Sequence, residues 1–374
     1  MSPQTRAPAQ STDFDGTRLT VARRLRRQTK SSLAREVGVS PSAIAQYENV
    51  DGPNPTQSVL NKICLALGLP REFFGLSRPL ALLPASEAHF RSLRSTSAAA
   101  REQALAYGEL SLELVNLINE YVDLPHVNIP ELSLPQELAD DVIARAASEV
   151  REAWGVAPGP IPSVVQLLEA HGIVTLRLPR DTDPAVDAFS TNAGRRPLVF
   201  LSKAKDDKAR SRFDAAHELG HIVLHPDTEP GSKLVEKQAH LFAAEFLMPR
   251  DEILDQLPRR IDWPTFHALK KHWGVSLRAL VFRAHALGKL SDASYRRANQ
   301  QLSMWGLPEP NPLGLSESPQ LLGMARELMT HNGIDFDGVL AAGRIAVDVT
   351  EELVIEGSAD KPKLSFSLPD STGA

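Results

Sequence analysis

The sequence has a single cysteine, Cys64, among 374 residues, and only 6% of its residues are aromatic. One thiol cannot close a disulfide within the chain, so a disulfide-stabilised secreted scaffold is excluded and a reducing compartment is indicated. No apolar run approaches the roughly 20 residues that a membrane helix needs. The first residues, MSPQTRAPAQSTDFDG, also lack the apolar core of a signal peptide. We therefore expect a soluble cytoplasmic protein without a membrane partner.

The net charge of the whole chain is only -5, which makes no case for nucleic acid, but the charge is unevenly distributed. Residues 16–76 contain nine Lys and Arg against four Asp and Glu, a local net charge of +5. A chain of 374 residues is too long for one ordinary domain. We expect a disordered arm at 1–15, a basic helical domain at 16–76 and a helical connector at 77–135. A domain of helices and strands at 136–290 and a mostly helical segment of unknown role at 291–374 follow.

Hydrophobic spacing predicts the main elements. Leu105, Leu110 and Leu114 recur at helical spacing and predict a helix over 97–121, and the prolines at 125, 130 and 135 then mark a connector. Further helices are expected at 137–154, 162–171, 209 onward, 232–248 and 319–330. Short strands are expected at 173–178, 186–191 and 198–202, with alternating runs at 345–355 and 363–368.

The strongest chemical motif is His217-Glu218-Leu219-Gly220-His221. On a helix, residues four apart share one face, so His217 and His221 can bind one tetrahedral metal ion. Glu218 points beside that ion, where it suits a general base that takes a proton from a metal-activated water. The alternative for all three residues is a purely structural role. Gly220 is unfavourable inside a helix and indicates that something packs closely there.

A third ligand is needed, and Glu236 in EKQAHLFAAEFLMP is the best candidate. His240 lies one turn further on the same face, where it can orient Glu236 from the second shell. Asp214, on the ligand side of the first helix, is a second-shell candidate that can orient a histidine. The alternatives are a solvated acid for Glu236, and a ligand or an ordinary core residue for His240. Two imidazoles, one carboxylate and an open position favour zinc, with manganese as the other candidate.

Five segments between 160 and 249 carry a family resemblance: PIPSVVQLLEAHGIVTLRL, VDAFS, RRPLVFLS, RFDAAHELGHIVLH and EKQAHLFAAEFLMP. Together they resemble the ImmA/IrrE family of metallopeptidases. The resemblance implies a small α+β zincin-like metallopeptidase domain, with His217, His221 and Glu236 as metal ligands and Glu218 as the general base. The family usually has Asn where this chain has His240.

Substrates of such peptidases typically pair as an added strand with the edge of a sheet. The candidate edge strand is Asp187-Ala188-Phe189-Ser190. The alternative is that this run is an interior strand of the core.

A second motif lies in SSLAREVGVSPSAIAQYEN. Ala34, Gly38 and Ile44 fall at the small, turn and apolar positions of a helix-turn-helix. Ser40 caps the second helix, and Ile44 anchors it to the core. This arrangement turns Ser42, Ala43 and Gln46 outward, where they can reach base edges in a major groove. Lys30, Arg35 and the Arg23–Arg27 cluster are expected to contact phosphates, and Ser40 lies at the same surface.

The wider segment from TRLTVARRLRRQTK to ICLALGLPREFF resembles the lambda-repressor-like (XRE) helix-turn-helix domains. It departs from them at Lys30, where such domains often carry Gln. Phe73-Phe74-Gly75 followed by FRSLRS resembles the connector of ImmA/IrrE proteins that carry the helix-turn-helix first. The alternative is a helical protein–protein module without a DNA role, because a fold does not fix a function.

These features predict a multidomain chain: an all-α helix-turn-helix domain, an α+β zincin-like metallopeptidase domain and a mostly helical C-terminal segment. The predicted function is a DNA-binding regulator, a homodimer on a double-stranded DNA operator. Its zinc endopeptidase domain is expected to cleave a repressor-like protein partner, or the chain itself, in a stress or induction response. The alternative is a non-proteolytic regulator or antitoxin whose metal site is structural or sensory. Glu218 favours the peptidase, because a structural metal site needs no base beside it.

Overall fold

The structure is a computed structural model that describes residues 14–75, 88–90, 97–179, 182–192, 196–203, 207–226 and 232–346, and the single positions 83, 194, 228 and 353. Most of the expected arm at 1–15, the FRSLRS run after Phe90 and most of the runs expected at 345–355 and 363–368 lie outside these residues. Phe14 and Asp15 belong to the folded part, because Phe14 forms a β-bridge with Gly75 and Asp15 caps the first helix.

Residues 16–74 form a compact group of helices: α1 (Gly16–Leu25), α2 (Lys30–Val37), α3 (Pro41–Tyr47), α4 (Gln57–Leu67) and the 3-10 turn η1 (Arg71–Phe74). The turn between α2 and α3 has the predicted chemistry. Gly38 takes a left-handed conformation with φ of 77°, which glycine adopts without steric cost. The Ser40 hydroxyl accepts a hydrogen bond from the Ala43 N–H at 3.0 Å and so caps α3. Ile44 is fully buried and fixes α3 to the core.

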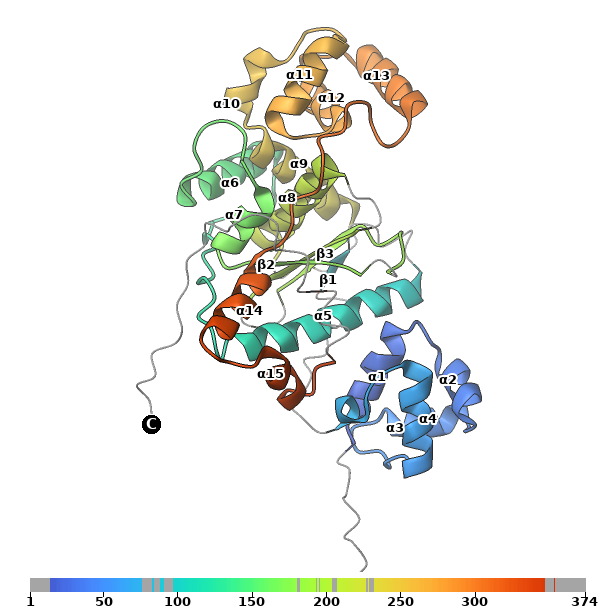
Figure 1. Cartoon of the computed structure of the whole chain (residues 1–374). Coiled ribbons are helices and arrows are strands. Elements are labelled where there is room, and N and C mark those ends of the chain that lie inside the picture. Colours follow the sequence, from blue (N-terminus) through green and yellow to red (C-terminus); the bar gives the residue numbers. More distant parts are fainter. Residues whose placement is uncertain are drawn as a thin grey trace, which may run out of the picture.

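A mixed sheet of four short strands lies at the centre of the rest of the chain (Figure 1). Its order is β1-β3-β4-β2, in which β1 and β4 run antiparallel to β3, and β2 runs parallel to β4. The strands are β1 (Ala88–Phe90), β2 (Val174–Arg177), β3 (Ala188–Thr191) and β4 (Leu198–Leu201). The expectation that residues 187–190 form an edge strand is therefore wrong, and the interior alternative holds. A segment 100 residues earlier in the chain covers that edge, which local sequence patterns cannot reveal.

Helices cover both faces of the sheet (Figure 1). The long helix α5 (Ala98–Ile118) lies on one face, and α8 (Lys208–Leu224) with α9 (Lys233–Leu247) lies on the other. Alternation along β3 divides the two cores: Phe189 packs with α5 and residues 16–74, whereas Ala188 packs with α8 and α9. The remaining helices are α6 (Asp140–Ala153), α7 (Val164–Ala170), α10 (Arg250–Ile253), η3 (Leu254–Gln256), α11 (Trp263–Trp273), α12 (Leu277–Ala286), α13 (Asp292–Trp305), α14 (Leu321–His331) and α15 (Phe336–Ala342).

Residues 306–320 lead from α13 back to the sheet, and their acidic side chains bind the starts of helices. Glu317 accepts hydrogen bonds from the backbone N–H groups of Val164 and Val165 at 2.8 and 3.0 Å and forms an ion pair with Arg212 of α8. Glu309 caps the start of α12 in the same way. A carboxylate at a helix N-terminus satisfies free N–H groups and complements the helix dipole. The segment of unknown role thus fastens the metal-motif helix α8 to α7.

The N-terminal helices rest on α5 through α1. Arg18 is fully buried and forms an ion pair with Glu113 of α5, and its Nη1 donates to the carbonyl oxygen of Arg344 at 3.1 Å. Arg24 Nη1 lies 2.9 Å from both carboxylate oxygens of Glu109. Removing one partner of a buried pair leaves an uncompensated charge, which costs about 3–5 kcal/mol. The N-terminal helices, α5 and the last described helices therefore share one continuous core.

A buried carboxyl of α7, which binds the start of α14, makes the stability of the chain depend on pH. Glu169 is fully buried and accepts from the N–H groups of Gln320 and Leu321, and burial raises its pKa to about 8. The folded chain keeps this proton where the unfolded chain has lost it, so the contribution to stability falls as pH rises from about 4.5 to about 8. Glu169→Gln removes the titration and keeps an acceptor. We expect the variant to gain stability over the wild type as pH increases through this window, measured by urea unfolding at about pH 5 and about pH 8.5.

Glu327→Gln is the control, because Glu327 is an exposed residue of α14, the helix whose start Glu169 of α7 binds. Its difference from the wild type should be the same at both pH values. A Glu169→Gln difference that does not change with pH would contradict the assignment of the raised pKa.

Candidate metal centre

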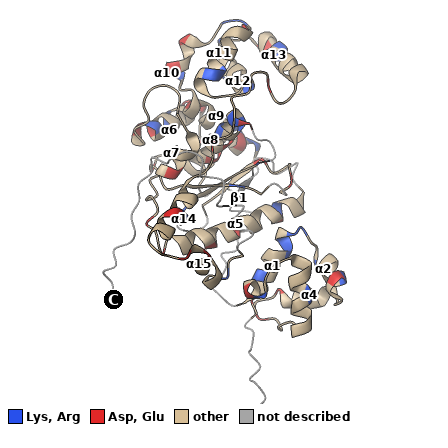
Figure 2. Cartoon of the chain, in the orientation of Figure 1, with Lys and Arg blue, Asp and Glu red and all other residues tan. Residues whose placement is uncertain are grey.

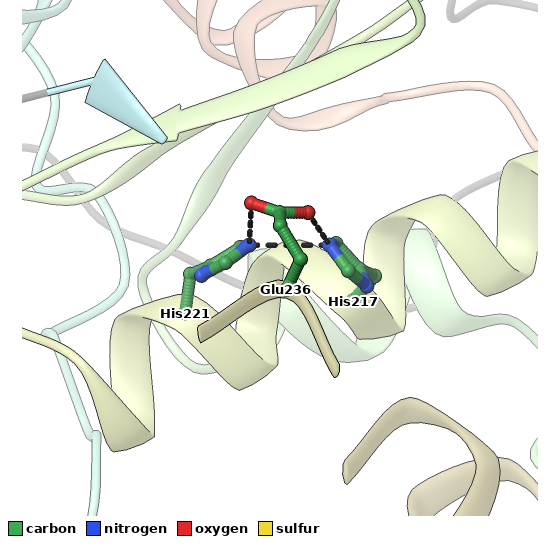
Figure 3. A group of neighbouring side chains, drawn as sticks. All are labelled: His217, His221 and Glu236. Atoms are coloured by element: carbon green, nitrogen blue, oxygen red, sulfur yellow. Dashed lines mark hydrogen bonds and ion pairs between the residues drawn. The ribbon is translucent and has the colours of Figure 1, made fainter. Parts of the chain in front are cut away.

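Helix α8 places the two motif histidines one turn apart on the same face. Both side chains are buried, and their Nε2 atoms lie 3.1 Å from each other. Glu236, in the first turn of α9, turns its carboxylate toward both rings (Figure 3). Its oxygens lie 3.3 Å from His217 Nε2 and 3.5 Å from His221 Nε2.

These spacings match one small tetrahedral ion. Two ligands that each lie about 2.0–2.1 Å from a tetrahedral centre are about 3.4 Å apart. The three donor atoms all lie within 4.8 Å of one another, and they are the only such group of three His, Cys, Asp or Glu side chains in the described residues. Two imidazoles and one carboxylate are also a donor set that metal ions bind in catalytic sites.

A close approach of α8 and α9 brings Glu236 to the histidines. A Cβ atom at Gly220 would lie 3.1 Å from Phe242 Cδ1 and 3.2 Å from the Ala239 Cα. Even the smallest side chain would make contacts tighter than is usual, so α8 and α9 lie unusually close together here. The sequence prediction of close packing at Gly220 is confirmed, and the packed partner is α9, the helix that carries Glu236.

The carboxylate of Glu218, next to His217 in α8, has a partner in the sheet. Its Oε2 accepts a hydrogen bond from the Ser190 hydroxyl at 2.7 Å, and both side chains are buried. The bond fixes Glu218 between the metal helix and β3. Ser190 lies in the run that the sequence predicts as a strand, but no local pattern links it to Glu218, which is 28 positions away.

Helix α3 presents a polar surface away from α5. Ser42 and Gln46 are exposed, Ala43 is half-buried and Ser40 is exposed at the helix start. Figure 2 shows basic residues of this part of the chain on α1 and α2, and α3 itself contains no charged residue. Arg35, on the exposed side of α2, stands beside this surface.

Family models match both parts of the chain. Residues 168–285 match a peptidase family described as the IrrE N-terminal-like domain. Residues 22–74 match the helix-turn-helix family. The chain joins a helix-turn-helix domain to an IrrE-like domain. No curated protein matches it. None of the described helices is long and apolar enough to cross a membrane.

Within the IrrE-like domain, the two predicted second-shell residues lie near His217. The His240 ring packs between Phe213 and Phe282, and its centroid lies 6.3 Å from that of His217. Asp214 is buried one turn before His217, with a carboxylate oxygen 3.7 Å from Arg210 Nε. Whether either side chain orients a ligand stays a prediction.

Two other polar residues of the IrrE-like domain have structural surroundings. His225 is buried at the end of α8, 2.9 Å from Gln238 Oε1, and burial lowers its pKa. A lowered pKa favours the neutral ring. Glu245 is buried and forms an ion pair with Arg283.

In the helix-turn-helix domain, phosphate contact by the Arg23–Arg27 cluster stays a prediction: Arg26 and Arg27 are exposed, but three arginines of the cluster have acidic partners within the chain. Arg23 pairs with Glu48 and Arg24 with Glu109, and Arg27 Nη2 lies 3.0 Å from Asp183 of the IrrE-like domain. These partners are distant in sequence, so composition alone overstated the basic surface. Lys30 is exposed, with Nζ 3.3 Å from Glu48 Oε2.

The ligand set can be tested by metal content. Glu236→Ala removes one of three donors, and we expect metal affinity to fall at least about 100-fold, beyond the effect of losing an outer-shell partner. The measurement is the zinc bound per chain after dialysis against a weak chelator. Glu149→Ala is the control, because Glu149 is an exposed glutamate on helix α6. Equal metal content in the two variants would exclude Glu236 as a ligand.

Proposed function

We propose that the chain is a DNA-binding regulator whose IrrE-like domain is a zinc endopeptidase. The observation that carries the proposal is the meeting of His217, His221 and Glu236 with Glu218 beside them. The substrate is a repressor-like protein, or the chain itself, and cleavage answers a stress or induction signal. The DNA partner is a double-stranded operator, bound by a homodimer.

Each residue of the site has a distinct task in this proposal. His217, His221 and Glu236 hold the ion. A zinc ion held there would lower the pKa of a bound water toward about 7 and polarise the scissile carbonyl. Glu218 takes the proton of the attacking water and passes it to the leaving amine. Ser190 holds one oxygen of Glu218, which limits the directions in which the other oxygen can face.

Burial supports a catalytic site over an incidental metal site. Glu218 is fully buried beside two buried histidines, and a carboxylate in such surroundings is unfavourable unless it has partners. A structural ion needs no such neighbour. The proposal for Glu218 as base rests on this position next to the donors.

A cleavage assay tests the enzyme. The zinc-loaded chain is incubated with repressor-like proteins encoded by neighbouring genes, and the products are followed by mass spectrometry. We expect Glu218→Gln to lower the cleavage rate at least about 100-fold, since general acid–base catalysis contributes that much or more. Zinc content should stay the same. If wild type with intact operator binding cleaves none of these proteins, the non-proteolytic regulator or antitoxin is the better description.

DNA binding is tested separately on α3. Selection from a pool of random duplexes gives the operator, and affinities follow from fluorescence anisotropy. Gln46→Ala should cost about 1–3 kcal/mol and relax sequence preference at one base pair, whereas Arg35→Ala should reduce the salt slope by about 1. Arg278→Ala, on exposed α12 surface, is the control and should change neither. Equal affinities of Gln46→Ala and wild type for the selected site would exclude base contact by Gln46.

A further inference from the structure

The edge of β3 is occupied by the chain's own connector. β1 is a three-residue strand from the segment between η1 and α5, and it pairs antiparallel with β3. In the register of this pair, His89 lies opposite Ser190 and Phe90 opposite Phe189. Residues 14–75 precede β1 and contain the helix-turn-helix domain, so the covering strand comes from the segment that links the two functional parts.

The position of β1 is the one that an extended substrate needs. Ser190 of β3 contacts Glu218 directly, and β1 pairs with β3 at the register position of Ser190. Neighbouring strands are about 4.8 Å apart. A peptide added outside β1 would be a second strand spacing away from β3, whereas proton transfer requires heavy atoms about 2.6–3.2 Å apart. A strand that takes the place of β1 would therefore be the nearest approach of an added peptide to Ser190 at this edge of the sheet.

The connector before β1 is held by a carboxylate that also holds the helix-turn-helix domain. The backbone N–H of Leu83, five residues before β1, donates to Glu109 Oε1 at 3.0 Å. Both oxygens of the same carboxylate lie 2.9 Å from Arg24 Nη1 of α1. Leu83 is buried and packs against Gly108, where a Cβ would lie 2.7 Å from Leu83 Cδ1. Because Glu109 binds both Arg24 and the Leu83 N–H, a shift of α1 relative to α5 would change the hydrogen bond that holds Leu83.

We propose that the β3 edge is an interaction surface for an extended segment of a protein substrate. In the structure, β1 of the same chain occupies this edge and so has an inhibitory role. The proposal rests on the peptidase function proposed above and adds its regulation. β1 must leave β3 before a substrate strand can pair there. The shared contact of Arg24 and Leu83 with Glu109 links that release to the position of the helix-turn-helix domain.

Hydrogen exchange on the full-length chain tests whether β1 protects the edge of β3, and this measurement needs no peptidase activity. His89→Pro and Phe90→Pro are measured separately, because alternate residues of an antiparallel strand direct their N–H groups at the partner. His89→Ala keeps the N–H and is the matched control. We expect those amides of residues 188–191 that face β1 to exchange at least about 10-fold faster in a folded proline variant than in the wild type or the control, whereas the amides bonded to β4 stay protected. A synthetic peptide of residues 84–94 should restore slow exchange.

Two results would overturn the occupied edge. Unchanged exchange in both proline variants, with unchanged thermal unfolding, would show that β1 does not protect β3. Faster exchange that the peptide cannot reverse would show that the freed edge does not accept an extended segment.

Cleavage of labelled casein by the zinc-loaded chain tests the regulation. We expect the proline variants to cleave at least about 10-fold faster than the wild type and His89→Ala, and the 84–94 peptide to inhibit them. Proline variants with a freed edge that cleave no faster than wild type would overturn the inhibitory role of β1. Absence of cleavage by every variant would contradict the proposed peptidase, whereas the exchange measurement would still decide whether β1 occupies the edge.

Discussion

The close contact of α8 with α9 at Gly220 is the constraint on which the metal centre depends. Two histidines on one helix give only two donors, and the third must come from a neighbouring helix at a fixed distance. A bare glycine lets α9 approach until Glu236 lies 3.3 Å from His217 Nε2. From the sheet, the Ser190 hydroxyl donates a hydrogen bond to Glu218 of α8. Helix α8, which is buried on almost every side, thus carries two of the three proposed ligands and the proposed base, and it contacts both α9 and β3.

Local patterns in the sequence predicted the parts of this fold that depend on near neighbours. Helix periodicity located α5, α8 and α9 to within a few residues, and cap chemistry located the turn at Gly38 and Ser40. The three donors followed from helical spacing and a family resemblance. Contacts between distant residues escaped prediction, because many pairings satisfy the same composition. The pairing of β1 with β3 and the ion pairs of Arg18 and Arg24 belong to this class.

One short sequence pattern occurs twice in the chain and forms the same local structure in two different surroundings. LAREVGVSPSAIAQ at 33–46 and LKKHWGVSLRALVF at 269–282 share a left-handed glycine, at Gly38 and Gly274, and a serine cap, at Ser40 and Ser276. Both form helix, turn and helix. Yet α3 is largely exposed, whereas α12 is largely buried and its Phe282 packs on His240 beside the metal site. The same local sequence pattern thus forms an exposed helix in one place and a largely buried helix in the other. The contacts with the rest of the chain determine which of the two it becomes.

The bond from Arg18 to the carbonyl oxygen of Arg344 joins residues 326 positions apart. A ribosome releases the N-terminal helices long before it adds residue 344, and domains fold as units in that order. Until residue 344 is added, Arg18 in the nascent chain lacks one of its partners. The seating of these helices on α5 becomes complete only late in synthesis, so a truncated translation product would keep the helix-turn-helix without its full attachment to the IrrE-like domain.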